Sequence, residues 1–202
     1  MDQLRHQLKS MALVIAACLA PAACGSEGRA GRAAAAAHVD SIVPRDVALA
    51  RIRNGVVEPP SLSGGAASRE ALVRQFLGAL ERRDTATLHA LLMTRAEFAY
   101  LYYPTNPEGL PPYDLSPGLM WFLLEGNSRR GLAHALEDRG GRPLRHLGVH
   151  CQPPTQQGAN TVWGGCVVSR LQAPGDTVVE PLFGPIIARG GRFKFVSYAN
   201  KL

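Results

Sequence analysis

Four cysteines are the residues of this 202-residue chain whose spacing most directly predicts chemistry. Cys18 and Cys24 lie near the N-terminus, whereas Cys151 and Cys166 lie on neighbouring expected strands. The second pair lacks the C-x-x-C spacing of a metal site, and both side chains are expected on comparable, core-facing sides. In an oxidising compartment such a pair is expected to form a disulfide. We therefore predict a Cys151–Cys166 bond, with two buried free thiols as the alternative.

A pair of histidines also has a spacing that occurs in metal sites. His146 and His150 are four residues apart, and on a helix they would face the same ion. The residues around them alternate with period two, which predicts a strand instead. On a strand the two side chains lie about 13 Å apart, too far to share a tetrahedral ion. We expect no metal site and no cofactor.

Aromatic side chains with polar tips gather around one proline-rich segment, PTNPEGLPPYD, at residues 104–114. Three tyrosines precede this segment, and Trp121 and Phe122 follow it. Such side chains suit a ligand pocket, and they also suit the rim of a hydrophobic core. The expected ligand-binding residues are Tyr100, Tyr103, Trp121 and His134, the last as polar lining.

Carboxylates supply no clear catalytic residue. Glu97 ends the motif TRAE that begins at Thr94, which is a capping box, so a structural role explains it without catalysis. Asp114 and Glu125 flank the expected Trp121 helix, and either would serve as a pocket acid in an isomerase-like site. The sequence has no G-x-S-x-G, S-x-x-K or P-loop motif. We assign no catalytic residue.

The N-terminus has the layout of an export signal. Arg5 and Lys9 precede an apolar run that begins at Met11 and is too short to span a membrane. Small residues ending in cysteine resemble the lipobox of bacterial lipoproteins, in which cleavage precedes a cysteine that then carries the lipid. Cleavage before Cys24 leaves a longer apolar core than cleavage before Cys18, and it leaves the two C-terminal cysteines as a pair.

We therefore expect a signal peptide at residues 1–23, lipid attachment at Cys24 and a membrane anchored through that lipid. Soluble export after cleavage at Ala22 and an apolar helix of the fold remain as alternatives. Because no aspartate follows Cys24, the resemblance to Gram-negative lipoproteins implies an outer-membrane lipoprotein facing the periplasm. The net charge is +6, but the arginines are scattered without a basic, aromatic-interleaved run, so we expect no nucleic-acid binding.

Composition divides the rest of the chain into three parts. Residues 24–40 are small and low in complexity and predict a flexible tether. Residues 41–60 predict a short N-terminal arm with a helix between Pro44 and Gly55. Residues 61–202 are expected to form one folded domain.

Helical periodicity and capping residues predict the elements of that domain. Ser68, Asp84 and Thr94 are expected N-caps, and Pro117 follows Ser116 at a first helical position. The expected helices span residues 69–82, 85–92, 94–103, 117–126 and 129–139. The segment GLMWFLLEG, at residues 118–126, is apolar nearly all round, so we expect it to be buried.

After residue 144 the apolar residues follow period two. The expected strands span residues 145–151, 161–171, 177–189 and 192–199, the third interrupted by Pro181 and Pro185. Helices first and then an antiparallel meander predict an α+β fold.

Both ends of the expected domain resemble a known superfamily. The helical segment SREALVRQFLGALERRDTATLHALL and the closing hairpin GGRFKFVSYANKL are similar to the nuclear-transport-factor-2-like, or steroid-isomerase-like, cone. The resemblance covers about residues 66–200 and implies N-terminal helices packed in a curved antiparallel sheet, a cystatin-like cone with an internal pocket. Catalytic members use an acid or base inside the cone, and no motif here matches theirs.

These features predict a lipid-anchored envelope protein whose domain binds a small apolar ligand or an envelope protein without chemistry. The alternative is an isomerase- or hydratase-like enzyme that uses a carboxylate and a tyrosine in the cone pocket. A third possibility is a structural envelope protein that docks through residues 41–60.

Overall fold

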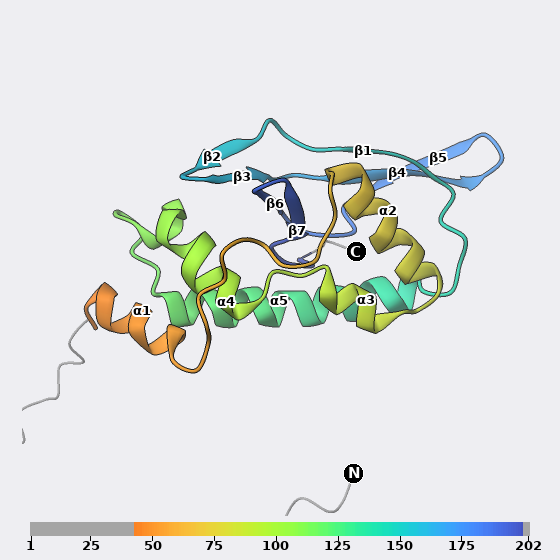
Figure 1. Cartoon of the computed structure of the whole chain (residues 1–202). Coiled ribbons are helices and arrows are strands. Elements are labelled where there is room, and N and C mark those ends of the chain that lie inside the picture. Colours follow the sequence, from red (N-terminus) through yellow and green to blue (C-terminus); the bar gives the residue numbers. More distant parts are fainter. Residues whose placement is uncertain (1–42, 200–202) are drawn as a thin grey trace, which may run out of the picture. The chain divides into compact units, whose positions relative to one another are not determined.

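A computed structural model describes residues 43–199, which form an α+β domain with antiparallel sheets, as predicted (Figure 1). The expected signal peptide, Cys24 and the tether at residues 24–40 lie outside the described residues. The helical elements are α1 (Arg45–Arg53), α2 (Arg69–Glu81), α3 (Thr85–Ala90), α4 (Arg95–Glu97), the π segment η1 (Phe98–Tyr102), the 3-10 turns η2 (Tyr103–Thr105) and η3 (Pro107–Gly109), and α5 (Pro117–Asp138).

The predicted N-caps are confirmed. The side chains of Ser68, Asp84 and Ser116 each accept a hydrogen bond from a backbone amide in the first turn of their helices. Thr94 and Glu97 form the complete capping box of α4. These bonds satisfy amides that have no partner inside the helix, so local sequence is enough to fix where each helix begins.

Helix α5 differs from the prediction in two ways. The two helices expected at 117–126 and 129–139 are one continuous helix, Pro117–Asp138. The expected burial of residues 118–126 is wrong, because the helix packs on the domain along one face that includes Met120, while its other side remains open. Three large apolar side chains are exposed there, namely Leu119 at 47%, Phe122 at 64% and Leu123 at 42%.

The strands form two antiparallel sheets instead of one meander. The strands are β1 (His146–His150), β2 (Thr155–Gln157), β3 (Asn160–Trp163), β4 (Val167–Ala173), β5 (Asp176–Glu180), β6 (Ile186–Arg189) and β7 (Arg192–Phe195). One sheet has the order β1-β4-β5 and the other has the order β2-β3-β6-β7. The run expected at 161–171 is split because Gly164 and Gly165 interrupt it, and Gly165 has a φ of 57°.

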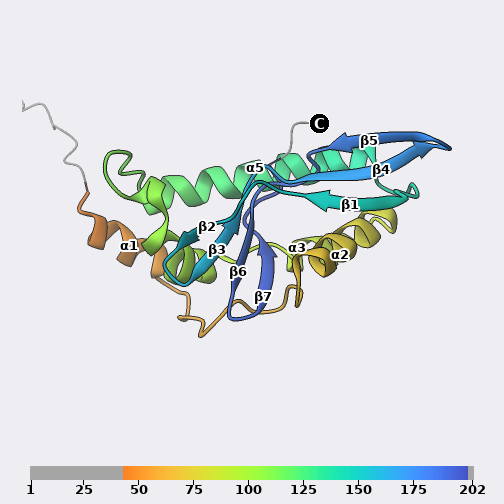
Figure 2. The ribbon, with the colours of Figure 1, turned by 90° about the horizontal axis from the view of Figure 1, so that it is seen from above.

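The strands form one layer of the domain and α5 runs along the other (Figure 1). Figure 2 shows the four-stranded sheet continuing from the end of the three-stranded one, with α5 along one side of the domain. Within residues 43–199, no helix is both long enough and apolar enough to cross a membrane.

Two hydrophobic clusters hold these layers together. The first centres on Phe76 of α2, whose ring contacts those of Phe183, Phe195 and Tyr198. The second centres on Phe98 of η1 and includes Ile52 of α1 and Met120 of α5. Because each fully buried side chain of this size contributes about 1.5–3 kcal/mol, the second cluster can hold α1 and the start of α5 in place.

The predicted disulfide between Cys151 and Cys166 is confirmed. Cys166 belongs to the first hydrophobic cluster, and Cys151 packs against that cluster from the end of β1. The bond closes a loop with a sequence separation of 15, between the two sheets.

Candidate functional site

A groove with a volume of about 810 Å³ lies where α1 meets the start of α5. Its apolar and aromatic lining comes from α1, from the η2–η3 segment and from the first turns of α5. Its charged lining is mainly cationic, with Asp114 as the carboxylate. The lining residues used below are Ile52, Tyr103, Gly118, Trp121, Arg45 and Asp114.

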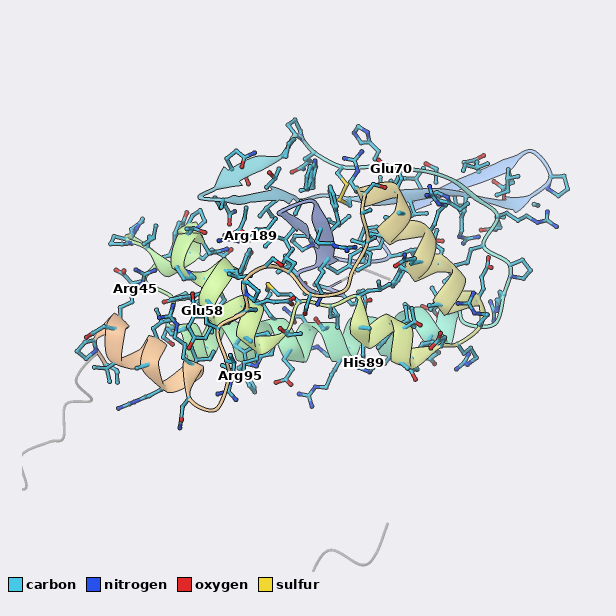
Figure 3. The ribbon with its side chains drawn as sticks, in the orientation of Figure 1. Arg45, Glu58, Glu70, His89, Arg95 and Arg189 are labelled. Atoms are coloured by element: carbon cyan, nitrogen blue, oxygen red, sulfur yellow. A yellow bond between two sulfur atoms is a disulfide. The ribbon has the colours of Figure 1, made fainter. Side chains whose placement is uncertain are left out.

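Helix α1 forms one wall of the groove and is held there by guanidinium groups. Arg53 donates from Nε and Nη2 to the carbonyl oxygen of Ala99, at 3.2 and 3.1 Å. Arg95 donates to the carbonyl oxygens of Ile52 and Asn54, at 3.0 and 2.8 Å, and so caps the C-terminal end of α1. Figure 3 shows Arg45 and Arg95 at opposite ends of this helix.

The Ala99 carbonyl is available to Arg53 because the backbone of η1 is a π-helix followed by a proline. The amide of Tyr103 donates to the carbonyl of Phe98, five residues earlier. In the same register the partner of the Ala99 carbonyl would be the amide of residue 104, and Pro104 has no N–H. The guanidinium of Arg53 replaces that missing donor, so a sequence-encoded gap in the helix becomes the attachment point of α1.

The floor of the groove is aromatic. Tyr103 and Trp121 both contact Phe98, with ring centroids 5.7 and 5.3 Å apart. The hydroxyl of Tyr103 donates to the carbonyl of Leu115 at 2.9 Å, which fixes the ring. A Cβ on Gly109 would lie 2.8 Å from a ring carbon of Tyr103, so only glycine fits beside the ring. The guanidinium of Arg45 lies 5.2 Å from the centroid of the same ring.

The structure brings together two of the four expected ligand-binding residues. Tyr103 and Trp121 line the groove. Tyr100 is half-buried beneath α1, with the Arg53 guanidinium 4.3 Å from its ring centroid. His134 is exposed on α5, about 20 Å along the helix axis from Trp121, and does not line the groove.

Glu97 lies between α4 and β7 and is fully engaged. Its carboxylate accepts from the amides of Thr94 and Ser63 at 2.7 and 2.6 Å, and from Lys194 Nζ at 3.0 and 3.3 Å. Burial alone would raise the pKa of Glu97, but the two amides and the ammonium outweigh it and hold the pKa below its usual value. A carboxylate held ionised by this many donors has a structural role, as the capping box predicts.

A second ionic cluster joins α5 to the three-stranded sheet. Glu180 of β5 accepts from Arg139 Nη2 at 2.6 Å and from Arg170 Nε. Burial acts to raise the pKa of Glu180, but the hydrogen bonds from the two arginines lower it further, and the net shift is downward. This carboxylate lies outside the groove and anchors the C-terminal end of α5.

A second groove, of about 690 Å³, lies on the other side of the η1–η3 segment. Its lining is more polar and includes Tyr102, Glu108 and Gln157. Burial, followed by the nearby Glu108 carboxylate, raises the pKa of Tyr102 to about 12. The buried Oε1 of Gln157 has no hydrogen-bond partner.

The role of the α1 arginines was not predicted from the sequence. Residues 41–60 were expected to form a separate arm, whereas α1 packs on the domain and completes the groove. The available signal was Pro104 at the end of a predicted helix, since a proline there leaves a carbonyl without a donor. Nothing local identifies Arg53 as the side chain that supplies the donor.

Comparisons with protein-family models, with curated proteins and with solved structures find no match to this chain. What the groove binds must therefore be inferred from its own side chains.

Proposed function

We propose that this chain is an exported, lipid-anchored envelope protein whose domain binds a small, largely apolar ligand in the groove between α1 and α5. The observation that carries the proposal is the groove itself, because its volume of about 810 Å³ lies within the range of small-molecule sites. Its aromatic floor, formed by Tyr103 and Trp121, supplies the contact area, and Arg45 at the rim suits a ligand with an anionic end.

The anchor and location are part of the same proposal. Lipid attachment at Cys24 would tether the domain to the outer membrane on its periplasmic side. The disulfide between Cys151 and Cys166 supports an oxidising compartment, since such bonds are rare in the cytosol. The order of helices followed by antiparallel strands supports the proposed relation to the nuclear-transport-factor-2-like cone.

An isomerase- or hydratase-like enzyme is less well supported by the side chains at the groove. Such chemistry needs a carboxylate free to accept or give a proton. Glu97 is occupied by four donor groups, and the Tyr103 hydroxyl is bound to Leu115. Asp114 is the remaining carboxylate in the lining, so turnover that disappears in Asp114→Asn would favour the enzyme.

The test of ligand binding is a variant that fills the groove without disturbing the fold. Gly118 lines the groove, and a Cβ there would meet nothing within 4 Å, so Gly118→Trp places a large side chain in the groove. Gly148→Trp is the matched control, because that glycine is equally open but lies on β1. Native mass spectrometry of protein purified from its own membranes measures the bound ligand.

We expect the wild type and Gly148→Trp to carry a small molecule of the same mass, and Gly118→Trp to lose it. A ligand retained in full by Gly118→Trp would show that the groove is not the binding site. Intact mass of the same preparations reports separately on an acyl group at Cys24.

A further inference from the structure

The outward face of α5 carries large apolar side chains that no described element covers. Leu119, Phe122 and Leu123 are spaced i, i+3 and i+4, so they share one side of the helix, and all three are exposed. The core-facing side of the same turns includes Pro117 and Met120, which are buried. Figure 2 shows α5 running along one side of the domain. We call Leu119, Phe122 and Leu123 the α5 apolar face.

Cations follow directly along the same side of the helix. Arg129 and Arg130 are exposed and lie two turns beyond the α5 apolar face. Arg130 donates to Asn127 at 2.6 Å, and no acidic side chain is recorded as its partner. Among the acidic residues of α5, Glu125 lies more than about 100° round the helix axis from the centre of the apolar face. Glu137 is about 22 Å further along the helix from Phe122.

We propose that the α5 apolar face inserts into the interfacial region of an anionic lipid membrane, with Arg129 and Arg130 on lipid phosphates. Leucine and phenylalanine beside arginine, on a helix parallel to the surface, are the composition of interfacial helices. A cationic side chain gains from the negative potential of anionic lipids. The net charge of +6 acts in the same direction.

The place where the chain enters the domain supports a membrane as the partner. Val43, the first described residue, lines the same groove as Gly118 and Trp121, so the chain enters beside the N-terminal half of α5. This part of the argument rests on the proposed anchor at Cys24. Roughly 19 residues separate Cys24 from Val43, and a chain of that length reaches at most about 65 Å. An anchored domain therefore stays close to lipid, where a weak surface contact is sufficient for docking.

The experiment uses the full chain with Cys18→Ser and Cys24→Ser, so that no acyl group contributes to binding. Flotation with vesicles of phosphatidylcholine, with and without phosphatidylglycerol, measures the affinity. The test variant is Leu119→Ser/Phe122→Ser/Leu123→Ser. The matched control is Leu147→Ser/Val179→Ser, which removes side chains that are 54% and 59% exposed on the strands. The apolar N-terminal segment is identical in all variants, so it cancels from the comparison.

We expect the control to bind anionic vesicles within about twofold of the parent, and the α5 variant to bind at least tenfold more weakly. Arg129→Gln/Arg130→Gln should lose the preference for anionic vesicles, whereas Arg74→Gln/Arg192→Gln, with the same change of charge, should keep it. Equal binding by the α5 variant and its control would overturn the proposal.

A vesicle-free measurement of molecular mass distinguishes another occupant. If the parent is a dimer that only the α5 variant dissociates, the face belongs to a second copy of the chain and the membrane proposal is wrong. Failure of the anchor is a separate outcome, because it is read from intact mass at Cys24. Failure of the ligand site is read from Gly118→Trp.

Discussion

Lys194 of β7 donates to both carboxylate oxygens of Glu97, at 3.0 and 3.3 Å, and both side chains are buried. The pair joins the last strand to the capping box of α4, beside the second hydrophobic cluster. Glu97 keeps its other donors from Thr94 and Ser63, so the ion pair is part of a fully satisfied network.

Glu97→Gln is expected to destabilise the domain by about 3–5 kcal/mol, because it leaves a buried ammonium without its counterion. Urea unfolding measures the loss. Glu70→Gln is the control, since Glu70 pairs with Arg69 at 3.0 Å but is 52% exposed, and it should cost less than about 1 kcal/mol. Similar losses in the two variants would contradict the structural role of Glu97.

Stability is expected to fall in acid partly through Glu180. Its folded pKa lies below the ordinary value of 4.5, so the unfolded chain binds the proton more readily. The stabilisation is complete above pH 4.5 and is lost as the pH falls through the folded pKa. Urea midpoints between pH 7 and pH 3 should decline less steeply for Glu180→Gln than for the wild type. Parallel curves would show that the two arginines do not shift this carboxyl.

Reduction of the disulfide is expected to lower the free energy of unfolding by about 3 kcal/mol, the value for a loop of this length. The Cys151→Ser/Cys166→Ser variant should be destabilised to the same extent, and reductant should then have no further effect on it. Urea unfolding with and without reductant makes the comparison. A wild type that is insensitive to reductant would mean that the bond does not form in the purified protein.

The attachment of α1 through Arg53 is expected to depend on Pro104. Arg53→Ala should cost about 1.5–3 kcal/mol, because it removes a charged donor from a carbonyl that has no helical partner. Pro104→Ala supplies an N–H in the register of that carbonyl, so Arg53→Ala should cost less in this background. A double-mutant cycle in urea measures the coupling.

Arg51→Ala on the same helix is the control and should change stability by less than about 0.5 kcal/mol, because Arg51 is exposed. Additive effects of the Arg53 and Pro104 substitutions would show that the arginine does not replace the missing amide.

Gly109→Ala is expected to displace Tyr103 and to cost about 1–3 kcal/mol, because the new Cβ would overlap a fixed ring. Gly118→Ala has open space and lies in a helix, so it should be neutral or slightly stabilising. Thermal unfolding compares the two variants. A Gly109→Ala domain as stable as the wild type would show that the Tyr103 ring is free to move.

The features that could be predicted from the sequence are those that short segments determine. The caps at Ser68, Asp84 and Thr94 were predictable because each bond joins residues three apart. The strand at His146 was predictable from its period-two pattern. The disulfide was predictable from parity and from the positions of its strands.

The features that could not be predicted depend on contacts between distant segments. The exposure of Phe122 was missed because an all-apolar segment does not show which side the core will cover. The groove was missed as a whole because Arg53 and Ala99 meet only in the folded chain. The division into two sheets follows from pairing between β3 and β6, which no local pattern specifies.

Helix α1 buries one side chain, Ile52, and its remaining attachment is largely through guanidinium groups bound to carbonyl oxygens. A segment held in this way can separate from the domain while both hydrophobic clusters stay intact. The groove exists only while α1 is in place, so its opening and its occupancy belong to one equilibrium. A bound ligand must therefore protect the amides of α1 from hydrogen exchange, and substitutions that loosen α1 must weaken the ligand by the same free energy.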